Sequence, residues 1–258
     1  MQRKKLIWIF FIFLILAVFS LFIFSEKKTV NYQPSFSSDQ SEKKIPTRGN
    51  IQIVSKETLS DIQPKKEEVE KIPDEIMLKV PFLSQAPFAN WDALHEDACE
   101  ETSLIMLKYF SDQKTTISKD SGEKEIQTLV KYEEKNGYGV SITLKELAQV
   151  AGDFFGMKNS RIEYNVSVED IKKELAFGKP VIIPAAGKIL PNPNFRNGGP
   201  VYHMLVLKGY DRDGFISNDP GTRKGEGFRY TFEDLFFAIH DWNGQDILKG
   251  QKAYLVFD

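Results

Sequence analysis

Hydrophobic and polar positions divide this 258-residue chain into three stretches of different character. Residues 6–24 carry no charge and are rich in Phe, Ile and Leu, whereas residues 25–75 are dominated by Lys, Glu, Ser, Gln and Pro. From residue 76 onward, apolar residues recur with the periods of helices and strands. We therefore interpret residues 1–24 as an apolar N-terminal segment, 25–75 as a linker and 76–258 as the folded domain.

The apolar segment is long enough to cross a bilayer. As a helix, residues 6–24 would extend for roughly 28 Å, which matches the hydrocarbon core of a membrane. Arg3, Lys4 and Lys5 precede the segment, and positive residues stay on the cytoplasmic side. The sequence thus predicts a single-pass anchor with a cytoplasmic N-terminus and an extracytoplasmic domain. A cleaved secretory signal has the same order of charges, but no small-x-small cleavage site follows the run; export is expected either way.

The linker contains too few large apolar residues to offset its chain entropy, so we expect it to be mobile. A flexible chain of about fifty residues has a reach of about 40 Å. Such a tether would keep the domain near the membrane yet free to search its surroundings. A plain spacer is the alternative.

The domain is predicted to be α+β, with helices early and paired strands late, which disfavours a βαβ repeat. Helix starts are indicated where a capping residue is followed three positions later by an acidic residue. This pattern occurs at Asp97–Glu100, Thr143–Glu146, Ser167–Asp170 and Thr231–Asp234. Gly156 and Gly178 stand where the second and third helices would end. Strands are predicted at 77–83, 181–183, 201–210, 215–218 and 253–257, with a hairpin turn at 211–214.

Composition excludes several classes of function. The chain has 34 Lys and Arg against 36 Asp and Glu, a net charge of -2, which argues against nucleic acid as a main partner. A single cysteine excludes an intramolecular disulfide and any multi-thiolate zinc or iron–sulfur site, and three histidines leave little for a histidine-rich metal centre. We expect no metal and no cofactor, and a monomeric domain.

The only cysteine, Cys99, falls in the first turn of the helix that Asp97 would cap. Backbone amides and the helix dipole favour a thiolate there, which is the nucleophilic form. A lone cysteine can also be an inert core residue. The charges of Glu100 and Glu101, which follow at once, would disfavour a thiolate. The catalytic interpretation therefore requires a histidine within hydrogen-bonding range of the sulfur.

His203 is the best candidate for that histidine. It begins a predicted strand, 104 residues after Cys99 and just behind a Gly-Gly-Pro loop, a position that both holds and exposes a base. A structural histidine is the alternative. His95 is expected to cap the helix entry or to line the cleft, and His240, after a Phe-rich helix, is expected to be structural.

Two further residues would complete the site. Asp219, on the return strand of the hairpin that carries His203, is preferred as the group that orients the imidazole, with Asn218 as its rival and turn formation as the alternative role. In an ideal antiparallel hairpin, Asp219 would lie at least three residues, or roughly 10 Å along the strand, from the partner of His203. A twist or bulge must therefore bring the two side chains together. Gln85, 14 residues before the cysteine, would donate to the oxyanion of a tetrahedral intermediate.

Residues in this order resemble the papain-like cysteine peptidases, and most closely the stand-alone C39-like branch of the double-glycine-leader peptidases. The resemblance covers most of 76–258 and is carried by VPFLSQ at 80–85, CEETS at 99–103, HMLV at 203–206, GYD at 209–211 and NDP at 218–220. It implies a two-lobed papain-like fold, with the nucleophile on an N-terminal helix and the His–Asp hairpin on a facing half-barrel. It also implies Gln85 as oxyanion donor, Cys99 as nucleophile, His203 as general base and acid, and Asp219 as orienter.

One departure from the family bears on activity: members commonly have a Gly-Pro pair after the cysteine, where this chain has Glu100 and Glu101. The function expected is covalent hydrolysis of a peptide or protein substrate by a membrane-anchored enzyme. A peptide-binding module without turnover, or a transpeptidase or amidase acting on cell-wall peptides, are the alternatives. Phe88, Trp91 and the loop 191–200 are candidates for lining the substrate cleft, with packing the expected role of the two aromatics.

Overall fold

A computed structural model describes residues 72–244 and 246–258 of this chain. The anchor and linker predicted for residues 1–75 lie outside the described residues, apart from 72–75. Within the described part, none of the helices combines the length and the hydropathy needed to cross a bilayer.

The helices are α2 (Ala93–Glu96), α3 (Cys99–Ser111), α4 (Lys119–Asn136), α5 (Leu144–Phe155), α6 (Val168–Ala176) and α7 (Phe232–Ala238). The strands are β1 (Ile76–Met77), β2 (Ser160–Tyr164), β3 (Val181–Ala186), β4 (Tyr202–Asp211), β5 (Gly214–Asn218), β6 (Glu226–Tyr230) and β7 (Ala253–Phe257).

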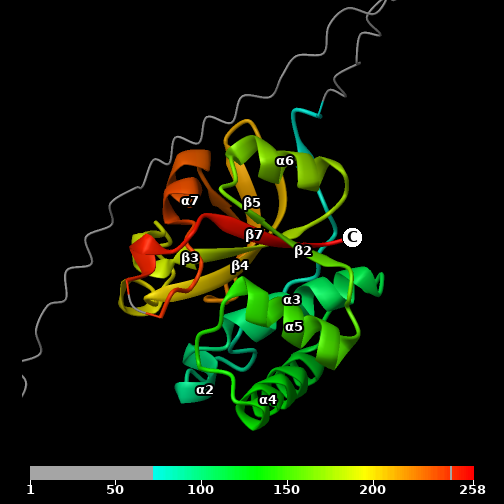
Figure 1. The fold of residues 1–258 in the computed structure, drawn as a ribbon, viewed down its shortest axis with the longest axis vertical. Coiled ribbons are helices and arrows are strands. Elements are labelled where there is room, and N and C mark those ends of the chain that lie inside the picture. The colour runs from blue at the N-terminus through cyan, green and yellow to red at the C-terminus, as the bar shows by residue number, and fades with distance from the viewer. Residues whose placement is uncertain (1–71, 245) are drawn as a thin grey trace, which may run out of the picture. The chain divides into compact units, whose positions relative to one another are not determined.

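A single antiparallel sheet forms the centre of the domain, in the order β2-β7-β3-β4-β5-β6, with β1 added beside β4. Helices α3, α4 and α5 lie on one side of the sheet, and α6 and α7 lie on the other (Figure 1). Strand β4 alternates between the two resulting cores: Met204 and Val206 pack with the α3–α5 side, and Leu205 and Leu207 with the α6–α7 side. Strands β3 and β4 are therefore apolar on both faces, as strands covered on two sides are.

Most predicted elements are confirmed. Thr143 and Ser167 form complete capping boxes at the starts of α5 and α6, and Thr231 caps α7. Gly156 ends α5 in the left-handed conformation. The β4–β5 hairpin and β7 occur where the pattern places them.

Two predictions are wrong, and two helices and two strands were not predicted. Asp97 does not cap α3, because that helix starts one residue later with Ala98 as its N-cap and no side-chain cap at all. The strand predicted at 77–83 is only two residues long, at Ile76–Met77. The chain then leaves the sheet, and Val80 and Leu83 pack into the core on the α3–α5 side. Helices α2 and α4 and strands β2 and β6 were not predicted. In α4, β2 and β6, polar residues mask short or one-sided apolar patterns.

Candidate active site

Cys99 is the first residue of α3 and lies where that helix packs against strand β4. Its sulfur accepts a hydrogen bond from the backbone N–H of Met204 at 3.4 Å. The residue is only 3 % exposed and does not line the main cleft. The helix thus presents its sulfur to the backbone of the residue that directly follows His203.

The thiol of Cys99 contacts the carboxyl group of Glu100. Sγ donates to Oε2 of Glu100 at 2.8 Å. Burial, followed by the charge of Glu100, raises the pKa of the Cys99 thiol well above its usual range. Both effects favour the protonated thiol over the thiolate.

The acidic pair after the cysteine is buried, which changes its electrostatic effect. Glu100 and Glu101 are 2 % and 5 % exposed. Burial, assisted by the charge of Glu101, raises the pKa of Glu100 to about 8. At neutral pH, Glu100 is thus mostly uncharged, and a neutral carboxyl can donate a hydrogen bond to sulfur instead of repelling a thiolate.

His203 lies on β4 with its ring buried and its two nitrogens in different surroundings. Nε2 is 2.8 Å from Oδ1 of Asp219. Because the Asp219 carboxylate accepts only, Nε2 carries the proton and Nδ1 is the basic nitrogen. Within the described part of the chain, Nδ1 has no hydrogen-bond partner. Phe195 packs edge-on against the ring, with 5.2 Å between centroids. This imidazole is oriented at one nitrogen and free to take a proton at the other.

Asp219 is the most heavily hydrogen-bonded group of the site. Oδ1 accepts from His203 and from the backbone N–H of Gly221, and Oδ2 accepts from the Tyr230 hydroxyl at 2.6 Å and from Asn192 at 3.0 Å. Burial alone would raise the pKa of Asp219, but the charge of His203 and these hydrogen bonds hold it below its usual range. The carboxylate stays ionised and can stabilise an imidazolium.

Asn218, the rival for the orienting role, points elsewhere. Its amide donates to the carbonyl oxygens of Val80 and Pro81, and its oxygen accepts from the N–H of Gly227. It ties β5 to the segment that leads to Gln85. Asp219, rather than Asn218, contacts the imidazole.

A register shift brings Asp219 closer to His203 than an ideal hairpin would. Leu207 pairs with Ser217 but Gly209 pairs with Ile216, so Lys208 is an extra residue on β4. The bulge advances the start of β4 by one residue relative to β5, and the reach of the two side chains covers the rest.

Gln85 lies in the cleft wall, but its amide is engaged. Nε2 donates to the carbonyl oxygens of His95 at 2.8 Å and Glu96 at 3.0 Å, while Oε1 has no partner in the described part of the chain. The backbone N–H of Gln85 donates to Pro220 O. The residue therefore joins the end of α2 to the turn that follows Asp219, and one of its N–H groups must be released to serve an oxyanion.

The other two histidines are held away from the chemistry. His95 is buried between Asp92, 2.7 Å from Nδ1, and Glu123, 3.1 Å from Nε2, and it does not line the cleft. His240 contacts the carbonyl of Gly250 through Nδ1 at 3.0 Å. Among residues 72–244 and 246–258, no group of three or more His, Cys, Asp or Glu is arranged to hold a metal ion.

Comparison with known proteins places this site in a family. The model of the Peptidase_C39 like family matches residues 77–246, which include Gln85, Cys99, His203 and Asp219. The chain belongs to this family. Among solved structures, this C39-like chain is similar to a candidate C39-like peptidase from Bacillus anthracis, with 18 % sequence identity and a TM-score of 0.48 over 72 % of this chain and 98 % of that one. A search of curated proteins found no match.

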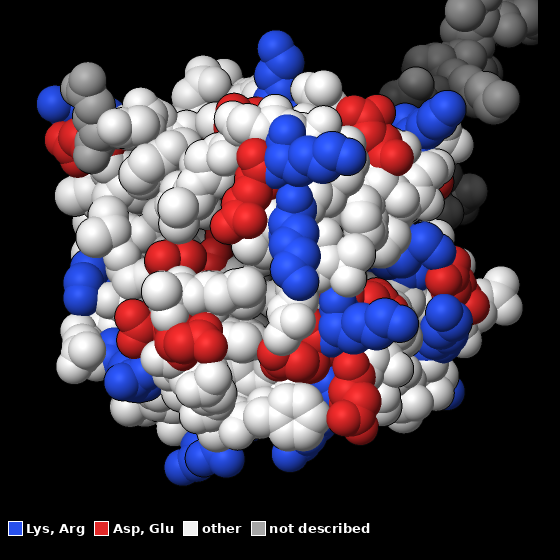
Figure 2. All heavy atoms as spheres, turned by 90° about the horizontal axis from the view of Figure 1, so that it is seen from below, with Lys and Arg blue, Asp and Glu red and all other residues white. Residues whose placement is uncertain are grey.

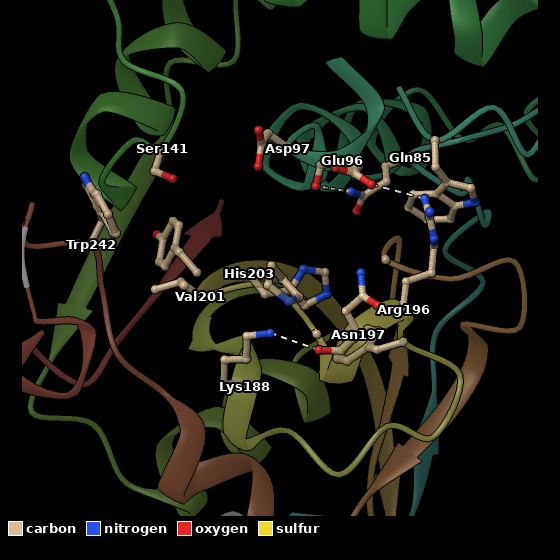
Figure 3. Close-up of a pocket in the computed structure, with 16 residues that line it drawn as sticks. Gln85, Glu96, Asp97, Ser141, Lys188, Arg196, Asn197, Val201, His203 and Trp242 are labelled. Atoms are coloured by element: carbon tan, nitrogen blue, oxygen red, sulfur yellow. Dashed lines mark hydrogen bonds and ion pairs between the residues drawn. The ribbon is translucent and has the colours of Figure 1, made fainter. Parts of the chain in front are cut away.

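The main cleft of the C39-like domain has a volume of about 400 Å³ and lies over His203 (Figure 3). Gln85, Glu96 and Asp97 face it from the helical side, and Lys188, Arg196 and His203 from the sheet side. An ion pair between Glu96 and Arg196, 3.1 Å long, joins the two sides.

Of the residues predicted to line the substrate cleft, some line the main cleft and others do not. Trp91 lines the cleft and lies 5.9 Å from the Arg196 guanidinium, whereas Phe88 is exposed and does not line it. Half of the loop 191–200, including Phe195, also lines the cleft. Tyr230 and Asn192 were not predicted as hydrogen-bond partners of Asp219. The only available signal was the short alternating run 226–230, which would have placed Tyr230 on a strand beside β5.

Proposed function

We propose that this chain is a cysteine peptidase that hydrolyses peptide bonds, with Cys99 as nucleophile and His203 as general base and acid. The observation that carries the proposal is the juxtaposition at β4. A buried imidazole with a free basic nitrogen is followed by the very amide that contacts the only sulfhydryl sulfur of the chain. Asp219 fixes the tautomer that leaves this nitrogen basic.

The proposed reaction starts from the protonated resting thiol. The Cys99 side chain turns from Glu100 toward His203, and Nδ1 takes the thiol proton. The sulfur electron pair then forms a bond to the peptide carbonyl carbon, and the carbonyl π pair moves to oxygen. Collapse of this intermediate breaks the C–N bond, with the proton of His203 passing to the leaving amine. Water hydrolyses the thioester by the same steps and restores the thiol.

Gln85 is the proposed side-chain donor to the oxyanion, together with the backbone N–H of Cys99. Its amide is positioned by the carbonyls at the end of α2. A developing negative charge is a stronger acceptor than a neutral carbonyl, so exchange of one partner favours the transition state. Loss of one such donor typically costs roughly 10²- to 10³-fold in kcat.

Cys99→Ala is the primary test of the peptidase proposal. We expect the variant to lose both peptide hydrolysis and labelling by a thiol-directed electrophile. Because Cys99 is the only cysteine, a mass shift on the unsubstituted chain reports this residue alone. A thermal unfolding curve matched to that of the parent chain controls for folding. Full hydrolysis by Cys99→Ala would end the proposal.

A second candidate function is a peptide-binding module that keeps the fold without turnover. The burial of Cys99 and the charge of Glu100, which raise the pKa of the thiol, favour this alternative. Chemical labelling distinguishes the two: a binding module leaves Cys99 unlabelled at neutral pH with a peptide-based electrophile and still binds the parent peptide. A peptidase is labelled faster than free cysteine.

We also propose that the enzyme acts outside the cytoplasm while anchored to the membrane by residues 1–24. The charge-free run 6–24 and the three basic residues before it support this topology. Retention of the chain in membranes washed with alkaline carbonate, together with its digestion by protease added to intact cells, is the expected result. Recovery of the full chain in the wash would contradict the anchor.

A further inference from the structure

A second cavity of about 330 Å³ lies beside the main cleft and shares one lining residue with it, Asp97. Four carboxylates line it, those of Asp97, Glu101, Glu133 and Glu134, and no Lys, Arg or His is among its lining residues. We call this the acidic cavity. On the face of the molecule drawn in Figure 2, Lys and Arg side chains are interspersed with Asp and Glu, whereas the lining of the acidic cavity contains acids and no base.

Two of these carboxylates are buried, and neither has a basic partner among the residues that the structure describes. Glu101, on α3, is 5 % exposed, and Glu133, on α4, is 4 % exposed. With both groups ionised, Oε2 of Glu101 and Oε1 of Glu133 have no hydrogen-bond partner among the described residues. The two carboxyls can hydrogen-bond to each other only by sharing a proton. Burial, followed by the charge of Glu101, raises the pKa of Glu133 to about 11, which keeps that proton in place at neutral pH.

The oxygens of Glu101 and Glu133 that lack a partner among the described residues offer acceptors to a positively charged group. An ammonium or guanidinium group would form charge-assisted hydrogen bonds to both carboxylates and release the proton. The remaining walls suit the stem of such a group, because Leu94, Val130 and the ring of Tyr138 offer apolar surface to methylenes. No cluster of three ligands for a metal ion exists in the described part of the chain, so the fitting ligand is an organic cation.

We propose that the acidic cavity binds the positively charged side chain of a lysine or arginine in the peptide that occupies the main cleft, an assignment that rests on the proposed peptidase function. Asp97 connects the two spaces. Its carboxylate faces the cleft opposite His203 (Figure 3), and the same residue forms part of the rim of the acidic cavity. Glu96, in contrast, is already paired with Arg196. A peptide in the cleft can thus place a basic side chain next to the reacting bond.

Equilibrium binding to the full chain carrying Cys99→Ala tests the site without any hydrolysis. The probes are two blocked tripeptides, acetyl-Ala-Lys-Ala-amide and the same peptide with norleucine in place of lysine, which keeps the stem and removes the charge. We expect the lysine peptide to bind about tenfold or more tightly, since hydrogen bonds to charged groups are the stronger ones. This preference should vanish when Glu101→Gln and Glu133→Gln are added, and persist with Asp120→Asn, an exposed carboxylate of the same helix.

Proton release supplies a readout that does not depend on the double variant folding. Titration in buffers of different ionisation enthalpy should show about one proton released per lysine peptide bound, and none for the norleucine peptide. The titratable groups that face the site are Asp97, Glu100, Glu101, Glu133, Glu134 and Tyr138. Equal affinities for the two peptides, or a lysine preference that survives in the double variant, would overturn the assignment. If the chain prefers the lysine peptide but hydrolyses no peptide, the peptidase proposal is wrong and the assignment of the acidic cavity stands.

Discussion

The sulfur of Cys99 lies 2.8 Å from Oε2 of Glu100, the residue that follows it, while the basic nitrogen of His203 has no hydrogen-bond partner in the described part of the chain. The thiol of the proposed nucleophile thus contacts Glu100 and not the basic nitrogen of the proposed base. In the proposed reaction, the thiol proton moves from a contact with Glu100 to His203, and the protonation state of Glu100 decides how easily this happens.

Glu100→Gln should lower the pKa of the Cys99 thiol. The substitution leaves the burial unchanged but removes the carboxylate charge, which is the next largest cause of the raised value. The pH dependence of iodoacetamide alkylation of the sole cysteine measures this directly. Glu101→Gln is the matched control and should shift the profile less, because the charge of Glu101 is the weakest of the influences on the pKa of Cys99. An unshifted or more alkaline profile for Glu100→Gln would contradict this account.

Glu133→Gln should stabilise the domain at alkaline pH. Burial raises the pKa of Glu133 to about 11, above the value of a carboxyl in an unfolded chain. The unfolded state therefore loses its proton first, and stability falls as the pH rises through the interval between the two values. The variant removes this loss, so its advantage should grow from pH 5 to pH 8 and reach about 1–4 kcal/mol. Urea unfolding at both pH values measures it, with the exposed Glu134→Gln as control.

A constant difference between the two pH values would show that Glu133 gains no proton on folding. In that case the packing of the amide, and not the titration of the carboxyl, would account for any change in stability.

Asp219→Asn should lower kcat by roughly 10²- to 10⁴-fold, because an amide can donate to the imidazole and invert the tautomer that leaves Nδ1 basic. Tyr230→Phe removes one hydrogen bond to Oδ2 of Asp219 and should lower kcat by about tenfold. Tyr254→Phe is the matched control, since its hydroxyl donates to Glu174, away from the cleft. A Tyr230→Phe variant with unchanged kcat and pH profile would show that the remaining three hydrogen bonds suffice to hold Asp219.

The contact between His203 and Asp219 could be predicted because both residues lie at the edge of an element with a strong local signal. His203 follows a Gly-Gly-Pro loop, and Asp219 precedes a Pro-Gly turn. Three of four predicted helix caps are also correct, because a capping pair lies within four residues of sequence and depends on nothing else.

What could not be predicted depends on contacts between distant segments. Asp97 has the sequence of a cap, but the connection from α2 leaves Ala98 at that position and turns the Asp97 side chain to the cleft. The sequence places the charges of Glu100 and Glu101 next to Cys99 but does not show that both side chains are buried, which follows from the packing of α3 against α4 and β4. Burial also raises the pKa of Glu100 to about 8, so the carboxylate charge that raises the pKa of the Cys99 thiol is largely absent at neutral pH.

Gly221→Ala should misplace the imidazole without unfolding the domain. A Cβ at this position would lie 2.9 Å from Cε1 of His203, 2.9 Å from Phe195 and 3.2 Å from Oδ1 of Asp219. The backbone of Gly221 is not among those with positive φ, and its N–H, which donates to Asp219, is retained in alanine. The cost is therefore steric and falls on the orientation of the ring.

Since a displacement of about 1 Å in a catalytic group can lower the rate by roughly 10²-fold, we expect a loss of that size in kcat with little change in thermal stability. Gly152→Ala, in the interior of α5, is the matched control, because its nearest neighbour would be 3.9 Å away. That variant should keep full activity and gain about 0.5–1 kcal/mol. Unchanged kcat in Gly221→Ala would mean that the imidazole does not need its present orientation for the reaction, and that the contact between His203 and Asp219 is structural.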